Sequence, residues 1–522
     1  MNGNAENHVK NAGPYKFYIM IIIKTGKREW PNRHESFTEQ IKDLYEAGNA
    51  RDLDALESYN DATKDFQKLI SEAIQTNTPL RSLGAGWSWS KIATARDGIM
   101  IDTKSLNTML GLTRSHVVPD YMGNAKKLLF AQCGSGVWEI NDELRAKKLS
   151  LKTSGASNGQ TIVGAMSTGA HGSSIDVGAV QDYIVGMHLI TGPNRHIWLE
   201  RKSFPVVSEK FTKKLQTELV QDDELFNAAL VSFGNFGIIH GVLAEVENQY
   251  LLEAYMQRMP YDASLKKMME TLDFSNANLP CGNERPFHFE VKLNPYDLEA
   301  GAYVSAFYKR RFRSDYEKPV NNGEGLGPGD DAPCFIGKII NAVPALVPIL
   351  VNKLLASSLT LFNKQMGSLG EIFNNTTLHG KLLSSALGLP LDQVNRVTAI
   401  LFEINKTDGP FPGLFSYRFV KKSKATLAFT HFDFTCILEL DGSFSDATTN
   451  FYRAVWKRLD EEQIPYTVHW GKVNELNADR INRMYGGAAD AWIAARNKLL
   501  DADSRKVFTN PLLQEWGLDK AL

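Results

Sequence analysis

The chain has 522 residues, a length that allows about two to four domains, and its 43% hydrophobic and 22% charged residues exclude wholesale disorder. Fifty-eight basic residues nearly balance fifty-nine acidic ones, and a formal charge of −1 without a basic tract argues against a nucleic-acid partner. The four cysteines show no CxxC spacing, so we expect neither a disulfide framework nor a cysteine zinc site, and their usage fits a reducing, cytoplasmic compartment.

The first half of the chain contains both strand and helix signals. Residues 17–23 form a short apolar run without a signal-peptide cleavage site, and we interpret it as a first strand. Apolar residues recur at helical spacing over 61–75, and Thr78-Pro79 ends this predicted helix. Further elements are expected at 80–83, 99–102, 128–131, 184–190 and 197–199 (strands) and at 137–147 (helix).

After about residue 250 the pattern is richer in strands. Residues 287–293 alternate apolar and polar side chains as a half-buried strand does. The region 398–440 contains long β-rich runs, including 429–440, and a helix is predicted at 447–461. The resulting division of the chain is a first domain at 1–250, a second domain at 251–464 and a C-terminal segment at 465–522 that returns to the first.

Residues 335–362 form a long apolar segment that raises the question of a membrane. It is interrupted by Lys338, Pro344, Pro348, Asn352 and Lys353, so no unbroken span of about twenty apolar residues remains. We favour a kinked pair of buried or half-buried helices. The alternative is a lid that rests on a lipid surface.

Two glycine-rich stretches, 84–88 and 155–174, each follow a predicted strand. Backbone without side chains can approach a diphosphate closely, and successive N–H groups form an anion site. Neither stretch is a Walker A motif, and Gly84-Ala85-Gly86 does not continue as GxGxxG, so the motif of a NAD-type Rossmann fold is missing. A third stretch, 232–242, predicts a glycine turn that leads into a buried strand.

Taken in order, these stretches resemble motifs of the flavoprotein family of vanillyl-alcohol oxidase and para-cresol methylhydroxylase. Residues 81–88 are similar to the family's Arg-x-x-Gly-x-Gly-His-Ser loop around the FAD diphosphate. Residues 160–173 are similar to its T-x-G-G…T-G-x-H-G-S run, and 232–242 to its L-G-x-x-G-I-I segment. Residues 468–472 resemble the P-H-W-G-K motif of the branch that contains aldonolactone, alditol and sterol oxidases.

The resemblance implies an α+β fold, in which a PCMH-type FAD-binding domain of two subdomains is joined to an α+β cap domain with an antiparallel sheet. It also implies FAD as the cofactor and a small-molecule substrate; no metal cluster is evident in the sequence. The residues that it assigns to FAD binding are Gly84, Ala85, Gly86, Trp87, Ser88, Gly155, Gln160, Thr161, Gly164, Ser167, Thr168, Gly169, His171, Gly172, Ser173, Gly237 and Ile239.

The sequence departs from the family pattern at two positions. Trp87 stands where many members of the branch carry a histidine bonded to the flavin, and because indole has no comparable nucleophilic nitrogen, we expect FAD to be held non-covalently. Ser416 stands where the alditol and lactone enzymes carry the glutamate of a Glu-x-Arg pair, whereas Arg418 is kept. The second departure points toward a larger, more apolar substrate.

By its place in the motif, Lys472 is the leading candidate for the cation that stabilises charge on the reduced flavin, with Arg418 as a second cation near the substrate oxygen. On a strand, His431 and Asp433 would share one face with Thr435, either as a polar wall that supplies a base or as a solvent face. The same alternatives hold for a second polar pair, His288 and Glu290. His469 is expected to pack or to form a hydrogen bond.

The predicted function is FAD-dependent oxidation of an alcohol-type C–H by hydride transfer to flavin N5, with oxygen as the electron acceptor. One alternative is a dehydrogenase that passes electrons to a quinone or a carrier protein. The other is a non-catalytic flavin-fold binding protein, because the missing loop histidine and the missing cap glutamate are what decay of the site would look like. The sequence carries no signature for the substrate or the oligomeric state.

Overall fold

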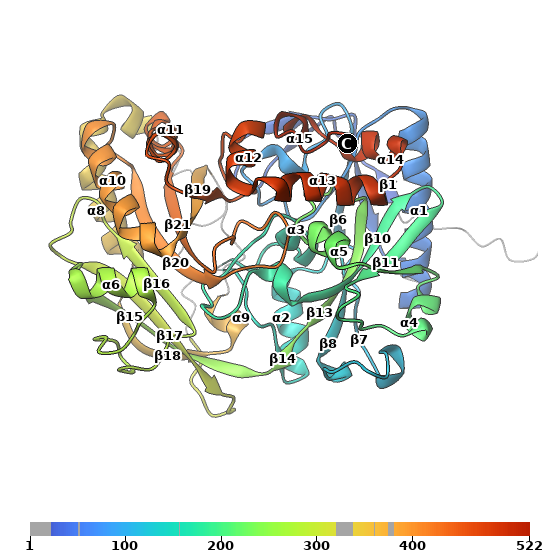
Figure 1. The fold of residues 1–522 in the computed structure, drawn as a ribbon, viewed down its shortest axis with the longest axis horizontal. Helices are drawn as coiled ribbons and strands as arrows, with labels where there is room; N and C mark the ends of the chain where they lie inside the picture. Colours follow the sequence, from blue (N-terminus) through green and yellow to red (C-terminus); the bar gives the residue numbers. More distant parts are fainter. Residues whose placement is uncertain are drawn as a thin grey trace, which may run out of the picture.

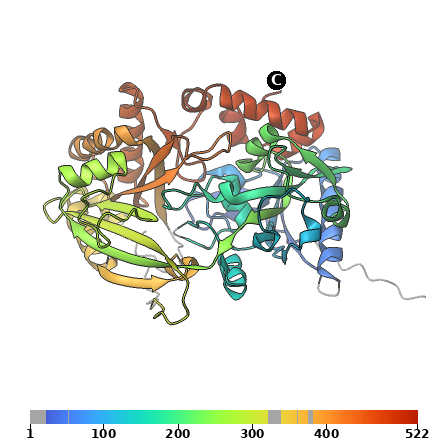
Figure 2. The same cartoon turned by 60° about the horizontal axis from the view of Figure 1, so that its bottom comes forward.

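The computed structural model describes residues 22–50, 53–155, 157–319, 338–359, 361–373 and 381–521. Within them the chain forms two bodies, which lie side by side in Figure 1 and are seen again from below in Figure 2. We call the body that holds the first half of the chain the base, and the body built on one large antiparallel sheet the cap. The C-terminal helices, coloured red, return from the cap to the base.

The base contains two main sheets. A four-stranded sheet has the order β1 (Ile22–Lys24), β4 (Asp43–Gly48), β6 (Ile99–Ser105), β5 (Leu80–Leu83), and its β4–β6 and β5–β6 pairs are parallel. A six-stranded sheet has the order β12 (Glu218–Gln221), β11 (Arg195–Glu200), β10 (Ile184–Gly192), β13 (Ile238–Glu245), β8 (Leu128–Gln132), β7 (Met109–Gly111). Small two-stranded pairs are β2 (Glu29–Pro31) with β3 (Thr38–Gln40) and β9 (Leu149–Ser150) with β14 (Glu247–Asn248).

The longest helix of the described base is α1 (Ala55–Gln75), which covers more residues than the predicted 61–75. It begins after Asp54, whose side chain accepts a hydrogen bond from the Leu56 amide, so this carboxylate caps an exposed helix end. Phe66 and Ile70 lie on its buried face, and the helix ends before Thr78-Pro79 as predicted. The other base helices are α2 (Val137–Ala146), α3 (Ile162–Ser167), α4 (Glu209–Lys214) and α5 (Asp223–Leu230).

The cap is an eight-stranded sheet in which every neighbouring pair is antiparallel. Its order is β18 (Phe362–Gly367), β15 (Tyr250–Met259), β17 (Ala302–Arg311), β16 (His288–Leu293), β20 (Gly413–Lys421), β21 (Phe434–Ser443), β19 (Leu382–Pro390), β22 (Thr467–Val468). The cap helices are α6 (Ala263–Thr271), α8 (Val347–Ser358), α9 (Leu369–Ile372), α10 (Val394–Thr407) and α11 (Asp446–Glu461). In Figure 1, α6 and α10 lie on the side of the cap away from the base, and α11 lies at the top of the cap.

After β22 the chain forms α12 (Ala478–Tyr485), α13 (Gly487–Leu499), α14 (Ala502–Phe508) and α15 (Pro511–Glu515). Two of these helices pack on the base, α13 on α5 and α14 on α1. Trp492 of α13 is fully buried, and its indole N–H donates to the Val231 carbonyl at 3.0 Å. The fold is therefore α+β with an antiparallel cap sheet, which confirms the predicted fold class.

The structure matches two of the predicted strands only in part. Of the predicted first strand at 17–23, only Ile22 and Ile23 are described, as part of β1; the rest lies outside the described residues. The predicted strand at 429–440 is wrong at its start, because β21 begins at Phe434 and 429–433 form an irregular segment with bends at 429 and 432–433. Residues 428–430 are buried, and sequence alone does not distinguish such a buried irregular run from a strand.

The apolar segment 335–362 is described from 338 to 359 and at 361–362. Residues 338–342 are helical, Pro344–Leu346 form a 3₁₀ turn, and α8 follows. Val347 and Val351 are buried against the cap, whereas Ile349 is exposed, which agrees with the prediction of kinked, half-buried helices. No helix in the described part of the chain is long and apolar enough to cross a membrane.

Candidate active site

A cavity of about 610 Å³ lies between the base and the cap. Most of the residues that the sequence assigned to a cofactor or to catalysis line it. They are Gly84, Ala85, Gly86, Trp87, Ser88, Gly155, Gln160, Thr161, Gly164, Ser167, Thr168, His171, Gly237, Ile239, Arg418 and Lys472. Segments more than 300 residues apart in the sequence thus meet around one space.

Three predicted residues do not line the cavity: Gly169, Gly172 and Ser173. They shape the loop behind it. A Cβ on Gly172 would lie 2.4 Å from the Ser154 carbonyl oxygen, so only glycine allows this approach of two backbone segments. Gly169 has φ +71°, and Ser173 is buried.

The first glycine-rich loop leaves the carboxyl end of β5 and packs directly on the second. A Cβ on Gly84 would lie only 2.0 Å from the Thr161 hydroxyl oxygen. Thr161 is the N-cap of α3, and its hydroxyl accepts a hydrogen bond from the Gly164 amide. The two loops therefore form one surface that is poor in side chains, as the glycine spacing predicted.

Arg81, on β5 just before the first loop, lines the cavity and is buried. Its guanidinium donates to the carbonyls of Ile92 (2.7 Å), Phe233, Gly234 (3.1 Å) and Phe508 (2.6 Å). No carboxylate of the described residues pairs with it. Burial lowers the pKa of Arg81 only to about 10, so the side chain stays charged at neutral pH. The base side of the cavity therefore contains a buried positive charge whose neighbours are neutral carbonyls.

The third predicted segment joins the same surface at the start of β13. Gly237 has φ +97°, and a Cβ there would lie 2.4 Å from the Ile190 carbonyl oxygen. The turn thus requires glycine both for its backbone angle and for its close approach to β10. Ile239, two residues later, lines the cavity.

Trp87 belongs to the first glycine-rich loop. The residue lines the cavity, and its buried indole N–H has no hydrogen-bond partner among the described residues. The Arg33 guanidinium lies 4.7 Å from the centre of the Trp87 ring. A buried donor without a protein partner is rare in folded proteins.

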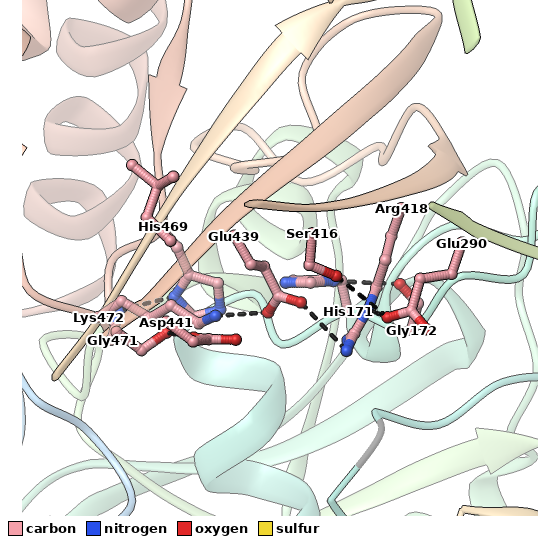
Figure 3. A network of polar contacts seen from close by, with 12 residues as sticks. His171, Gly172, Glu290, Ser416, Arg418, Glu439, Asp441, His469, Gly471 and Lys472 are labelled. Atoms are coloured by element: carbon pink, nitrogen blue, oxygen red, sulfur yellow. Dashed lines mark hydrogen bonds and ion pairs between the residues drawn. The ribbon is translucent and has the colours of Figure 1, made fainter. Parts of the chain in front are cut away.

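The cap side of the cavity carries a charged cluster that we call the cap network; Figure 3 labels its members except Lys292. Its members are Glu290 and Lys292 on β16, Arg418 on β20, Glu439 and Asp441 on β21, and Lys472 after β22. Arg418 lies between two carboxylates: its Nε is 2.8 Å from Glu290 Oε1 and its Nη2 is 3.1 Å from Glu439 Oε2. Lys472 Nζ lies 2.5 Å from Glu439 Oε1.

Strand register explains why these side chains meet. Ser416 on β20 lies opposite Lys292 on β16 and opposite Glu439 on β21, while Arg418 lies opposite Glu290. Residues two apart on a strand share one face, so the three strands present their polar positions to the cavity. Ser416 is small, and its hydroxyl donates to Glu290 Oε1 at 3.2 Å.

The network shifts the pKa values of its carboxyl groups in different directions. Burial raises the pKa of the Glu439 carboxyl, but the charges of Arg418 and Lys472 outweigh burial and hold that pKa well below its usual range. Glu290 behaves in the same way beside Lys292 and Arg418. For Asp441, burial raises the pKa, although Lys472 lies nearby and the Ser384 hydroxyl donates to it at 2.5 Å.

Two buried histidines lie beside the network. His171 of the second loop and His469 of the C-terminal motif have ring centres 5.5 Å apart. Burial lowers the pKa of His171 to about 4, and burial followed by the neighbouring His171 lowers that of His469. His469 Nδ1 accepts a hydrogen bond from the Gly471 amide at 3.0 Å, which agrees with the predicted hydrogen-bonding role.

The other polar candidates from the sequence have different positions. His431 and Asp433 do not line the cavity, and both precede β21. The Asp433 side chain is 96% exposed, so of the two alternatives left open for 431–435 the solvent face holds for Asp433. His288 is buried and stacks on Phe307 with ring centres 4.2 Å apart. Glu290 is buried in the network rather than on a solvent face.

Sequence reasoning missed Glu439 and Asp441. Both lie in a run that was recognised as β-rich, and their spacing of two residues was the available signal for a shared face. That signal does not say which face meets the cavity. Only the pairing of β21 with β20 and β19 fixes it.

Apolar side chains of the cap also line the cavity: Ile340, Leu350, Val351, Leu382, Leu383, Pro412 and Leu414. Leu350 and Val351 belong to α8, so the apolar segment that raised the membrane question forms part of this wall. The cap side of the cavity thus combines the charged cap network with an apolar lining.

The residues present fit an FAD molecule. A diphosphate requires main-chain amides and positive charge, which the glycine surface and Arg81 supply. The isoalloxazine ring requires donors near its heteroatoms, and Trp87 offers an unpartnered N–H. The side chains of the base that line the cavity are mostly small, so an extended dinucleotide can lie against the backbone.

Comparison with known proteins agrees with this fit. Residues 60–199 match the family model described as FAD binding domain. The chain is therefore a flavoprotein with a PCMH-type FAD-binding domain, as the motifs predicted, and FAD is its cofactor.

Individual relatives extend the likeness to most of the chain. It is 22% identical over 505 residues to L-gulonolactone oxidase 3 of Arabidopsis thaliana, covering 88% of this chain and 80% of that protein. It is 23% identical over 454 residues to L-gulono-1,4-lactone dehydrogenase of Mycobacterium tuberculosis, covering 85% and 92%. Among solved structures, cholesterol oxidase from Brevibacterium sterolicum (His121Ala mutant) has a TM-score of 0.69 at 14% identity, covering 95% and 97% of the two chains. The likeness to the solved structure concerns the fold.

Proposed function

We propose that the chain is an FAD-dependent oxidoreductase that oxidises an alcohol-type CH–OH group. The observation that carries this proposal is the meeting of the glycine surface and the cap network in one cavity. Relatives named as lactone oxidase and lactone dehydrogenase support the reaction class. FAD, when bound, accepts the hydride of the substrate carbon at N5.

The chain's own residues would orient the substrate and manage charge. Lys472 lines the cavity at the cap network and would stabilise negative charge on the reduced flavin. Arg418 would hold the substrate oxygen, because its guanidinium is fixed from two sides by Glu290 and Glu439. A cation held in this way needs no reorganisation during the reaction.

The binding of FAD would be non-covalent. The Trp87 indole cannot form the bond that a histidine forms at this position, and the buried His171 has its Nδ1 3.1 Å from the Gly172 carbonyl. The FAD-binding set would include Gly169, Gly172 and Ser173, which shape the second loop from behind. We further propose the division into an FAD domain at 1–250, a cap at 251–464 and a returning segment at 465–522.

The substrate would be a small molecule with an apolar part. The hydroxyl-bearing carbon would lie beside the cap network, and the remainder would pack against Leu350, Val351 and Leu414. Burial of apolar area there favours a larger substrate than a sugar lactone. Oxygen is the proposed acceptor, and the protein would work in the cytoplasm.

The test is anaerobic mixing of the FAD-loaded protein with a panel of neutral alcohols, aldonolactones and sterols, followed by the flavin absorption. Bleaching by a member of the panel supports the proposal, with an apolar alcohol expected to bleach faster than an aldonolactone. Rapid return of the colour in air identifies an oxidase, whereas slow return favours a dehydrogenase with another acceptor. Protein that takes up no added FAD would overturn the proposal in favour of a non-catalytic protein.

A variant sharpens this test. Replacing Lys472 by Met should leave FAD bound but slow bleaching by about 100-fold or more, the usual effect of removing one group that stabilises developing charge. The matched control is Lys457→Met on the exposed face of α11, which should bleach at the unmodified rate. Equal rates in the two variants would remove Lys472 from the proposed chemistry.

A further inference from the structure

Glu439 is a buried carboxylate that the proposed chemistry does not yet use. Its side chain is 6% exposed, lines the cavity and lies opposite Ser416 in the register of β20 and β21. Oε1 accepts a hydrogen bond from Lys472. Oε2 lies 3.1 Å from Arg418 Nη2 as an ion pair but has no hydrogen-bond partner among the described residues.

A buried carboxylate oxygen without a donor has unused capacity to accept a hydrogen bond. Figure 3 shows Glu439 between Lys472 and Arg418, in the middle of the cap network. The two cations keep this carboxylate ionised, so it accepts hydrogen bonds and does not donate them. Oε2 can therefore accept a hydrogen bond from a donor group of a molecule in the cavity.

The charges of the network also restrict what can bind. Lys292, Arg418 and Lys472 form ion pairs with two carboxylates, Glu290 and Glu439. Glu290 lies behind the wall and does not line the cavity, whereas Glu439 does, as does Asp441, a carboxyl whose pKa burial raises. A ligand beside Arg418 and Lys472 therefore meets Glu439, whose charge already pairs with both cations, and a second anion next to this carboxylate would be repelled by it in a water-poor space.

We propose that Glu439 is the substrate-positioning residue of this site: its free oxygen accepts the hydrogen bond of the substrate hydroxyl, and its charge selects neutral alcohols over hydroxy acids. This inference rests on the proposed function. On β20, Ser416 stands at the position without a carboxylate, and Glu439 lies directly opposite it on β21. Because side chains directly opposite on an antiparallel pair are neighbours, Glu439 can supply the carboxylate from β21.

The test separates the charge of Glu439 from its reach. Glu439→Gln removes the charge and keeps the length, whereas Glu439→Asp keeps the charge and shortens the side chain by one methylene. Glu253→Gln is the matched control, because Glu253 is an ion-paired carboxylate of the same sheet, on β15 beside Arg310, and does not line the cavity. FAD content and flavin absorption of each variant report correct folding.

The first measurement uses sulfite, a small anion that adds reversibly to oxidised flavin and changes its absorption. We expect E439Q to bind sulfite at least tenfold more tightly than the unmodified holoprotein, because Arg418 and Lys472 lose their counter-charge. E439D and E253Q should lie within about threefold of the unmodified value. Equal sulfite affinity in E439Q and the unmodified protein would overturn the selection by charge.

The second measurement uses the neutral alcohol that bleaches the flavin. Both E439Q and E439D should raise the KM for this alcohol at least tenfold. In E439Q an amide takes the place of the carboxylate and changes the pairing with Arg418. In E439D the shorter side chain does not reach the substrate hydroxyl. An unchanged KM in E439D would overturn the positioning role, and this arm decides the matter if E439Q does not fold. If no alcohol bleaches the unmodified protein, the proposed function fails, while the sulfite arm still tests the charge of Glu439.

Discussion

Replacement of Arg81 tests the base side of the cavity most severely. Its guanidinium connects three separate segments of chain through the carbonyls of Ile92, Phe233, Gly234 and Phe508. After Arg81→Met, the Ile92 carbonyl keeps a partner, because the Asn510 amide also donates to it at 3.1 Å. The Phe508 carbonyl also keeps a donor, because the Asn235 side-chain amide donates to it at 3.1 Å. The carbonyls of Phe233 and Gly234 lose the hydrogen bond that Arg81 supplies.

A buried carbonyl left without a donor costs about 1–3 kcal/mol, which gives about 2–6 kcal/mol for two. Removing a buried charge returns part of this cost, because the guanidinium is desolvated in the fold. We therefore expect Arg81→Met to lower the free energy of unfolding by about 2–4 kcal/mol. Arg81→Lys retains the charge but supplies three donors from one point, so its loss should be about half as large.

The assay is urea unfolding of the FAD-free protein, followed by titration with FAD. Arg81→Met should also weaken FAD binding at least tenfold, about 1.4 kcal/mol, while Arg81→Lys should weaken it less because the positive charge remains. Arg396→Met is the control: this arginine pairs with Glu462 on the surface, and its loss should cost less than about 1 kcal/mol. Unfolding of Arg81→Met within about 0.5 kcal/mol of the unmodified protein, with unchanged FAD affinity, would refute the reasoning.

Three further predictions concern the loops, the buried histidines and the attachment of the cofactor. Gly237→Ala should lower the free energy of unfolding by about 2–4 kcal/mol in urea, because strain at φ +97° adds to a contact of 2.4 Å between the new Cβ and the Ile190 carbonyl. The control Gly282→Ala, at φ +61° with nothing near its Cβ, should cost about 1 kcal/mol. Equal losses in the two variants would contradict the role of close approach at Gly237. Burial lowers the pKa of His240 to about 3, so between pH 6.5 and 3 the unfolded chain takes up a proton that the fold excludes, and stability falls by up to about 1.4 kcal/mol per pH unit as the pH decreases. His240→Gln should reduce this slope by that amount between pH 6.5 and 4.5, and an unchanged slope would count against it. Because Trp87 replaces the histidine of the first loop, acid precipitation of the holoprotein should release all of its FAD into the supernatant; yellow colour retained in the pellet would contradict non-covalent binding.

Many secondary-structure elements and the glycine-rich loops on the base side of the cavity could be predicted, because short stretches of sequence determine them. Gly84 and Gly237 lie where other groups approach too closely for a Cβ, and this requirement is visible in the sequence as glycine in the glycine-rich stretches. Helices α1 and α11 carry a helical apolar period, and both begin at a residue whose side chain caps the first turn. Such features need no knowledge of distant contacts.

The cap network could be predicted only in part because it depends on strand pairing. Arg418 and Lys472 were recognised from their motifs, but Glu439 and Asp441 join them through the register of β20, β21 and β19. A shift of one residue would turn both carboxylates to the other face of the sheet, and no local pattern in 434–443 excludes it. The missing glutamate at Ser416 therefore looked like decay, whereas the folded chain supplies a carboxylate from the next strand.

The central claim is that FAD lies between the glycine surface and the cap network. A crystal structure of the FAD-loaded protein tests it most directly. The account predicts one FAD per chain, with its diphosphate within hydrogen-bond distance of the amides of 84–88 and its ring facing Lys472. A flavin bound elsewhere, or a cavity between Arg81 and Glu439 that excludes the nucleotide, would contradict it.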